Sequence, residues 1–147
     1  GFGLNPTLAL AAADAAGDTP TMKIVAVTAL TSLGQEDLKE LGIDRQIDTH
    51  ILKLGELALS QGIHGLVCSP LEAGAFRTNF GQDPILVTPG IRPAGNSKDD
   101  QKRTATPETA VKAGADYLVI GRPILEAPDK HKTALSIIRE IEKASGF

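Results

Sequence analysis

Two pairs of glycine and arginine, each placed after an apolar stretch, are the residues of this chain best suited to bind an anion. Gly90 and Arg92 follow one stretch, and Gly121 and Arg122 follow the next. Glycine lets backbone N–H groups approach a ligand closely, and the forked guanidinium of arginine suits phosphate oxygens. The two pairs together predict phosphate binding, although a solvated arginine in a strand-ending turn would give the same local pattern.

The segment between the two pairs carries further polar residues. Lys98, Lys102 and Arg103 are interpreted as solvated charges, so only Arg92 is assigned a direct ligand role there. Gln101 has both donors and an acceptor, and it could span a phosphate oxygen and the edge of a base. An exposed loop glutamine is the simpler interpretation of the same residue.

Hydroxyl side chains end an earlier apolar stretch, in the sequence TALTS from Thr28 to Ser32. They could hydrogen-bond a polar ring at the same edge of the fold, or they could cap the helix that follows. From the residues alone, capping is the favoured interpretation.

Residues for a chemical reaction are not recognisable. His50, His64 and His131 lie far apart without metal-ligand spacing, and we expect no metal and no cofactor. Cys68 lies within an apolar stretch, which favours a buried structural thiol over a nucleophile. The sequence contains no Walker A motif, G-x-S-x-G elbow or ordered catalytic triad. The residues therefore predict binding chemistry but no reaction.

The composition is that of one globular domain. The chain has 147 residues, of which 41% are apolar and 22% charged, and we expect a single domain over residues 1–147. A net charge of −3, no tryptophan and one tyrosine argue against nucleic-acid binding. No apolar run reaches the roughly 18 to 20 residues of a membrane span, and no secretory pattern opens the sequence. We therefore expect a cytoplasmic location.

Four short apolar stretches are predicted to be strands. They are rich in Val, Ile and Leu and nearly continuous: Lys23 to Leu30, Gly65 to Ser69, Pro84 to Gly90 and Tyr117 to Pro123. This pattern is typical of parallel strands that are covered on both faces and linked by helices. The predicted fold class is therefore α/β.

Periodicity and capping signals place helices between these stretches. Ser69 and Glu72 form a capping-box pattern with proline at the first helical position. The last helix is expected to carry an apolar stripe of Leu135, Ile138 and Ile141, with Ile137 beside it. The predicted helices cover the alanine-rich opening up to Gly17, the segment from Ile47 to before Gly62, and the segments that begin at Ser69, Thr106 and Asp129.

Four strand–helix units form either a small doubly wound sheet or half of an eight-stranded barrel. In a (β/α)8 barrel, functional residues lie at the carboxyl ends of the strands, and a phosphate site often follows the last two. The two glycine–arginine pairs follow the last two predicted strands here. Because a whole barrel needs about 250 residues, this chain would form about half of one.

From about Lys23 to Ile141, the sequence resembles orotidine 5'-phosphate decarboxylase of the bacterial type, which converts orotidine monophosphate to uridine monophosphate. The resemblance rests on AVTALTS, on GLVCSPLEA, on VTPGIRP followed by Gln101, and on ATPETAVKAGADYLVIGRPI. It implies a TIM (β/α)8 barrel of which this chain supplies the last four βα units. Residues 1–17 resemble the turn and helix after the fourth strand.

Carried over residue by residue, the resemblance implies that this chain binds the substrate. It assigns the phosphate to Arg92, Gly121 and Arg122, the pyrimidine ring to Thr31 and Gln101, with Gln101 also touching the phosphate, and the floor of the site to Pro89 and Gly90. It also implies that the loop from Gly90 to Arg103 is a mobile cover over the ligand.

The resemblance assigns no catalytic residue to this chain. The family's catalytic lysine and aspartates include an Asp-x-Lys-x-x-Asp motif, which this sequence lacks. Asp37 and Asp100 begin similar patterns, but Gly42 and Ala105 stand where the second aspartate would be. Decarboxylation without a cofactor must stabilise a carbanion-like centre and then protonate it, which a phosphate-binding site alone does not do.

An open half-barrel leaves apolar surface and strand edges uncovered, so we expect association with a missing amino-terminal half or as a homodimer. The expected ligand is orotidine or uridine monophosphate, with no nucleic-acid or membrane partner. One alternative is a non-catalytic half-barrel that binds a phosphate or nucleotide and pairs with its own copy. Another is a different decarboxylase or isomerase of the same barrel group.

Overall fold

The computed structural model describes residues 6–17, 22–29, 33–93 and 104–146, in which strands and helices alternate. Each predicted strand and each predicted helix is present. In chain order the elements are α1 (Pro6–Gly17), β1 (Val25–Val27), α2 (Gln35–Glu40), α3 (Ile47–Ser60), β2 (Gly65–Val67), α4 (Pro70–Phe80), β3 (Ile85–Thr88), α5 (Pro107–Lys112), β4 (Tyr117–Leu118), α6 (Arg122–Leu125) and α7 (Lys130–Ser145).

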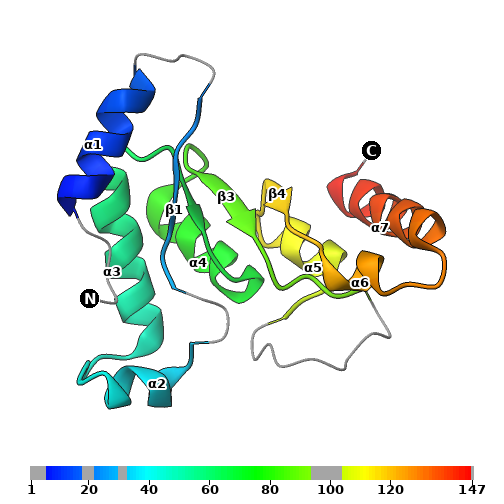
Figure 1. Cartoon of the computed structure of the whole chain (residues 1–147), viewed down its shortest axis with the longest axis horizontal. Coiled ribbons are helices and arrows are strands. Elements are labelled where there is room, and N and C mark those ends of the chain that lie inside the picture. Colours follow the sequence, from blue (N-terminus) through cyan, green and yellow to red (C-terminus); the bar gives the residue numbers. More distant parts are fainter. Residues whose placement is uncertain (1–5, 18–21, 30–32, 94–103, 147) are drawn as a thin grey trace.

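The four strands form one parallel sheet in the order β1-β2-β3-β4 (Figure 1). Val27 pairs with Val67, Val67 with Val87, and Val87 with Tyr117. Consecutive strands are neighbours, as they are in a (β/α)8 barrel. The strands are shorter than the apolar stretches that predicted them, because residues such as Ser69 and Gly121 already act as helix caps.

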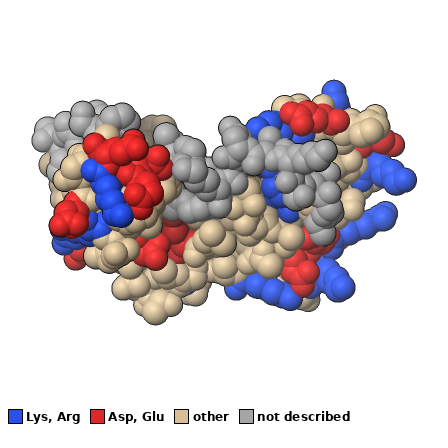
Figure 2. All heavy atoms as spheres, turned by 90° about the horizontal axis from the view of Figure 1, so that it is seen from below, with Lys and Arg blue, Asp and Glu red and all other residues tan. Residues whose placement is uncertain are grey.

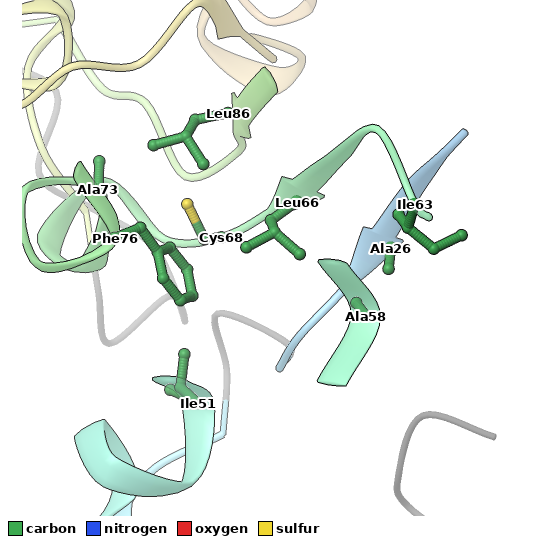
Figure 3. Packing of buried hydrophobic residues seen from close by; sticks show 9 residues of the cluster. All are labelled: Ala26, Ile51, Ala58, Ile63, Leu66, Cys68, Ala73, Phe76 and Leu86. Atoms are coloured by element: carbon green, nitrogen blue, oxygen red, sulfur yellow. The ribbon is translucent and has the colours of Figure 1, made fainter. Parts of the chain in front are cut away.

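The hydrophobic core lies between one face of the sheet and helices α3 and α4 (Figure 3). Leu66 and Leu86 point from their strands towards Phe76 of α4, and Ile51 of α3 approaches the same ring. These side chains are at most 1% exposed. Burying an aliphatic or aromatic side chain of this size contributes about 1.5–3 kcal/mol, so this layer is the main source of stability in the sheet.

Among the described residues, no helix covers the opposite face of the sheet. Val27 is 53% exposed, Tyr117 62% and Val119 51%. Side chains alternate along a strand. Ala26, next to Val27 in β1, and Leu86, in β3, therefore point to the helices and are buried. The expectation that both faces of the strands are covered is therefore wrong for the described residues, since the helices they contain pack on one face only.

Helix starts follow the predicted capping residues. The Thr106 hydroxyl accepts a hydrogen bond from Thr109 N at 3.2 Å, and the Asp129 carboxylate accepts one from Lys132 N at 2.9 Å. The capping box at Ser69 is half formed: the Glu72 carboxylate accepts from Ser69 N at 2.9 Å, but the buried Ser69 hydroxyl has no partner within the described residues. These local bonds fix where α4, α5 and α7 begin.

Helices α1 and α3 lie side by side at one end of the molecule, and α5, α6 and α7 lie together at the other (Figure 1). Ile137 is the buried apolar residue of α7, whereas Leu135 and Ile138 of the predicted stripe are exposed. Two residues of the stripe therefore face away from the packed part of the described chain, while Ile141 is half-buried. In a closed barrel the stripe would face the neighbouring βα unit.

Charged side chains are unevenly spread over the surface. Figure 2 shows lysines and arginines gathered towards the end that α7 occupies, while the middle of the described part of that face is mostly uncharged. Helix α7 itself carries Lys130, Lys132, Arg139 and Lys143.

Among the described helices, none combines the length and apolar character that a membrane crossing requires.

Replacing Gly65 with alanine tests the close contact between β2 and β3. A Cβ at Gly65 would overlap the Ile85 carbonyl oxygen and lie 2.7 Å from the Ile85 Cβ. We expect Gly65→Ala to lower the free energy of unfolding by about 1–3 kcal/mol in urea denaturation. The matched control is Gly74→Ala in α4, where a Cβ meets no atom within 4 Å and helix propensity favours alanine by up to about 1 kcal/mol. Equal effects of the two substitutions would contradict this packing.

Candidate substrate-binding site

The two glycine–arginine pairs follow the carboxyl ends of two neighbouring strands, β3 and β4. Strand β3 ends at Thr88 and β4 at Leu118, and these two residues are paired in the parallel ladder. Parallel strands that are paired in this way have their carboxyl ends together. The segments that carry Gly90 and Gly121 therefore begin side by side, as the sequence predicted.

Gly90 turns the chain at the end of β3. Its φ of 82° lies in the left-handed region, which glycine adopts without the steric cost that other residues incur. The buried Ile91 then forms a parallel bridge with Ala105, in which Arg92 N donates to the Ala105 carbonyl at 2.9 Å and Ala105 N donates to the Gly90 carbonyl at 3.4 Å. This bridge ties together the segments on either side of residues 94–103.

Arg92 is half-buried and lies against its own strand end. One guanidinium nitrogen, Nη1, donates to the Ile91 carbonyl at 2.9 Å. A guanidinium carries five N–H donors, so one arginine can bond to several acceptors at once. Pro89, the other expected floor residue next to Gly90, is also half-buried.

Gly121 and Arg122 begin the short helix α6, which the sequence reading did not predict. The Gly121 carbonyl accepts from Ile124 N at 3.0 Å and from Leu125 N at 3.1 Å. The signal that could have found the helix is Pro123, because proline is favoured in the first turn. A Cβ added to Gly121 would meet no atom within 4 Å, so open space lies beside this backbone. That space is where an anion can approach.

The two residues assigned to the pyrimidine ring, Thr31 and Gln101, lie outside the described residues, as do Lys98, Lys102 and Arg103. Their placement stays a prediction. Thr28 is described, and it does not cap the next helix, α2, whose N-cap residue is Gly34. Thr28 is buried and its hydroxyl donates to the Val67 carbonyl at 3.2 Å, so it joins β1 to β2.

Thr88 has the same role between β3 and β4, which was not predicted from the sequence. Its side chain is fully buried, and its Oγ1 donates to the Tyr117 carbonyl at 3.2 Å. Thr28 and Thr88 each stand directly after a paired valine, at the carboxyl end of a strand. A threonine at this repeated position is the signal that could have predicted a brace between strands.

The thiol of Cys68 belongs to the hydrophobic core. It is 1% exposed and points towards the helices (Figure 3). Burial raises the pKa of the Cys68 thiol to about 12, with a smaller upward contribution from the Glu72 carboxylate and an opposing one from the Arg77 guanidinium. The thiol is therefore protonated at neutral pH, and the predicted burial of Cys68 is confirmed.

The histidines of the described residues are not gathered into a metal site. His64 Nδ1 accepts a hydrogen bond from Ile24 N at 3.1 Å, which places its ring beside the start of β1. Within residues 6–17, 22–29, 33–93 and 104–146, no three His, Cys, Asp or Glu side chains are close enough together to hold a metal ion.

Comparison with known proteins identifies the relatives of this chain. The sequence model of the Orotidine 5'-phosphate decarboxylase / HUMPS family matches residues 5–137. An orotidine 5'-phosphate decarboxylase from Gluconobacter oxydans is 47% identical over 127 residues, which is 86% of this chain and 54% of the relative. Another from Geobacter sp. strain M21 is 46% identical over 138 residues, covering 94% of this chain and 58% of the relative. The chain thus spans little more than half the length of these relatives.

Solved structures agree with the sequence comparison. A crystal structure of orotidine 5'-phosphate decarboxylase from Lactobacillus acidophilus superimposes with a TM-score of 0.77 at 33% identity. The match covers 93% of this chain and 59% of that one. An uncharacterized conserved protein from Geobacillus kaustophilus gives a TM-score of 0.72 at 30% identity. The parallel sheet with helices on one face is thus part of a TIM barrel, which confirms the predicted fold class.

Alkylation of Cys68 tests its burial. Because the thiolate is the reacting form, a buried thiol with a pKa of about 12 should react with iodoacetamide at pH 8 far more slowly than an ordinary cysteine. In urea the same thiol should react at the rate of an unstructured peptide. Mass spectrometry of timed samples measures both rates, and equal rates in the folded and unfolded protein would contradict the structure.

Proposed function

The chain belongs to the Orotidine 5'-phosphate decarboxylase / HUMPS family, and we propose that it is the part of an orotidine 5'-phosphate decarboxylase that binds the substrate's phosphate and pyrimidine. The reaction is the conversion of orotidine monophosphate to uridine monophosphate and carbon dioxide in pyrimidine synthesis, in the cytoplasm. The observation that carries the proposal is the pairing of β3 with β4, which brings the segments of Gly90 and Gly121 to one edge.

The phosphate is bound by two types of donor in this proposal. The open space beside Gly121 admits the phosphate to the backbone, and Arg122 follows directly with its guanidinium. Arg92 adds a second guanidinium from the neighbouring strand end. Charge-assisted hydrogen bonds of this type are about twice as strong as neutral ones, so they can hold the substrate by a group distant from the reacting carbon. Such binding supports orientation of the ring.

The pyrimidine contacts of Thr31 and Gln101 complete the binding half. Both positions rest on the resemblance of TALTS and DDQKR to the family motifs. A side-chain amide can accept and donate at the same time, which suits the alternating donors and acceptors of a pyrimidine edge. Pro89 and Gly90 form the floor between the two groups of contacts.

Catalysis requires groups that this chain does not supply. In the family, a lysine and aspartates on the first barrel strands stabilise the carbanion-like centre and protonate it. We propose that a further half-barrel packs on the uncovered face, where Val27, Tyr117 and Val119 are exposed. Residues 1–147 then form the carboxyl-terminal half of one (β/α)8 domain, and we expect the complete protein to be a homodimer.

A second function is favoured by the same uncovered face. Two copies of this chain could close eight strands without any other polypeptide, which would give a non-catalytic phosphate-binding assembly with two sites. The intact mass of the polypeptide from its native source separates the two proposals. A mass well above 15.4 kDa supports the enzyme, and a 15.4 kDa polypeptide that assembles only with itself supports the binding module.

Arg122→Ala tests the phosphate site. We expect a loss of at least about 2 kcal/mol in the binding of uridine monophosphate, because a charge-assisted contact is removed. Titration calorimetry on the protein as isolated from its source measures the affinity. The matched control is Arg139→Ala, which removes an exposed arginine from α7 and should leave the affinity unchanged. Unchanged binding by Arg122→Ala would refute the phosphate site.

Gln101→Ala tests the pyrimidine contact. We expect the substitution to weaken uridine monophosphate more than ribose 5-phosphate, because only the first ligand carries the ring that the amide would contact. The same titration with both ligands gives the comparison. If the two affinities fall by the same factor, Gln101 does not contact the pyrimidine.

A further inference from the structure

Arg77 of α4 makes an unusually large set of hydrogen bonds for one side chain. Its side chain is 8% exposed. Nε donates to the Gly114 carbonyl at 2.9 Å, and Nη2 to Asp116 Oδ2 at 2.6 Å. Nη1 is shared among three carbonyls, those of Pro84 at 2.8 Å and of Gly81 and Gln82 at 3.3 Å. The guanidinium is thus surrounded by acceptors.

Four of these acceptors lie in the segments that precede β3 and β4, at the end of the strands opposite the candidate site, and the fifth, the Gly81 carbonyl, belongs to the carboxyl-terminal cap of α4. Pro84 immediately precedes β3, and Asp116 immediately precedes β4. The backbone of the α5–β4 turn fits closely around the arginine: Gly114 has a φ of 98°, and a Cβ there would lie 2.7 Å from Arg77 Cγ. One side chain therefore holds the starting points of both strands.

Asp116 extends this contact into the strand ladder. Its Oδ2 accepts from Leu86 N at 2.7 Å as well as from Arg77, and its own N donates to the Leu86 carbonyl at 3.0 Å. Asp116 thereby binds both backbone groups of Leu86. The β3–β4 ladder itself has only two residue pairs, whereas β1–β2 and β2–β3 have three each. Side chains thus contribute much of what fixes the register of β4.

The register of β4 decides where its carboxyl end lies. A slip by one residue would move the end of the strand by about 3.3 Å and turn each side chain to the other face. Gly121 and Arg122 follow β4 within a few residues, and Gly90 and Arg92 follow β3. A shift between the two strands would therefore separate the two halves of the phosphate site.

We propose that Arg77 and Asp116 are positioning residues, which set the register of β4 against β3 and so hold Arg122 at the phosphate site. The inference rests on the proposed function for its effect on binding, but the effect on the strands is independent of it. The pair differs from a surface salt bridge, which contributes little, because the Arg77 side chain is buried, although Asp116 is 44% exposed, and because the arginine also bonds to the Pro84 and Gly114 carbonyls before the two strands.

Hydrogen exchange tests the register directly. Arg77→Lys keeps the positive charge but removes the forked guanidinium donors. Asp116→Asn removes the negative charge but keeps an oxygen that can accept from Leu86 N. We therefore expect Asp116→Asn to disturb the strands less than Arg77→Lys does. We expect Arg77→Lys to lower the protection of the Asp116 and Val119 amides, which bond to β3, about tenfold or more. Protection of the Cys68 amide, which bonds Val87 across β2–β3, should change less. Equal loss at all three amides in both variants would overturn the proposal.

The matched control for the charge is Lys53→Gln. It breaks the Lys53–Glu56 pair on α3, which has the same 2.6 Å separation but lies in solvent. We expect this variant to leave the protection of all three amides unchanged. A loss at Val119 in the control as large as in Arg77→Lys would also overturn the proposal.

Binding of uridine monophosphate tests the consequence for the site. We expect Arg77→Lys to weaken binding roughly tenfold or more when Arg122 is present, and to have a smaller effect after Arg122→Ala, where the Gly121 backbone and Arg92 are the remaining donors. Equal losses in both backgrounds would mean that Arg77 acts on stability alone, which overturns its positioning role. If the unaltered protein does not bind the nucleotide, the proposed function fails, while the exchange rates still decide whether the pair sets the register.

Discussion

Parallel hydrogen bonding between β3 and β4 is the interaction on which the candidate site depends. It brings the segments that carry Gly90 and Gly121 to one edge, although they are separated by α5 and by the residues outside the structure. Thr88 braces the pairing near that edge with its bond to the Tyr117 carbonyl, and Asp116 binds Leu86 near the other. The β3–β4 ladder has only two residue pairs, so these two side-chain hydrogen bonds contribute much of the contact that holds the strands together.

The two faces of the sheet have different relations to the rest of the chain. One packs on α3 and α4 and contains the buried layer around Leu66, Leu86 and Phe76. The other leaves Val27, Tyr117 and Val119 exposed. Uncovered apolar faces and open strand edges favour association, because water is removed from apolar surface and backbone groups become paired. In a (β/α)8 barrel the face of the strands that carries no helices points to the interior, and this chain matches only 54% and 58% of the length of the two sequence relatives.

The ends of the strands divide their tasks. At the carboxyl ends, a left-handed glycine, the Ile91–Ala105 bridge and the open space at Gly121 create a surface that can accept a ligand. At the amino ends, the Arg77 guanidinium donates hydrogen bonds to the Gly114 and Pro84 carbonyls and to the Asp116 carboxylate. The candidate binding residues lie on segments after the strands, and the bonds of Arg77 lie at the segments before them. This is the usual division in barrels of this type.

The sequence by itself determined the α/β class, the four strands, the capped starts of α5 and α7 and the glycine–arginine pairs, because each depends on neighbours within a few residues. Tertiary structure decided which groups those residues meet. The Thr28 hydroxyl binds a carbonyl 39 residues away, and Arg77 binds acceptors 37 and 39 residues away, so neither role is visible in local patterns. Exposure of Leu135 and Ile138 likewise depends on which elements surround α7. A hydrogen bond or contact between distant segments exists only once the sheet has fixed their separation.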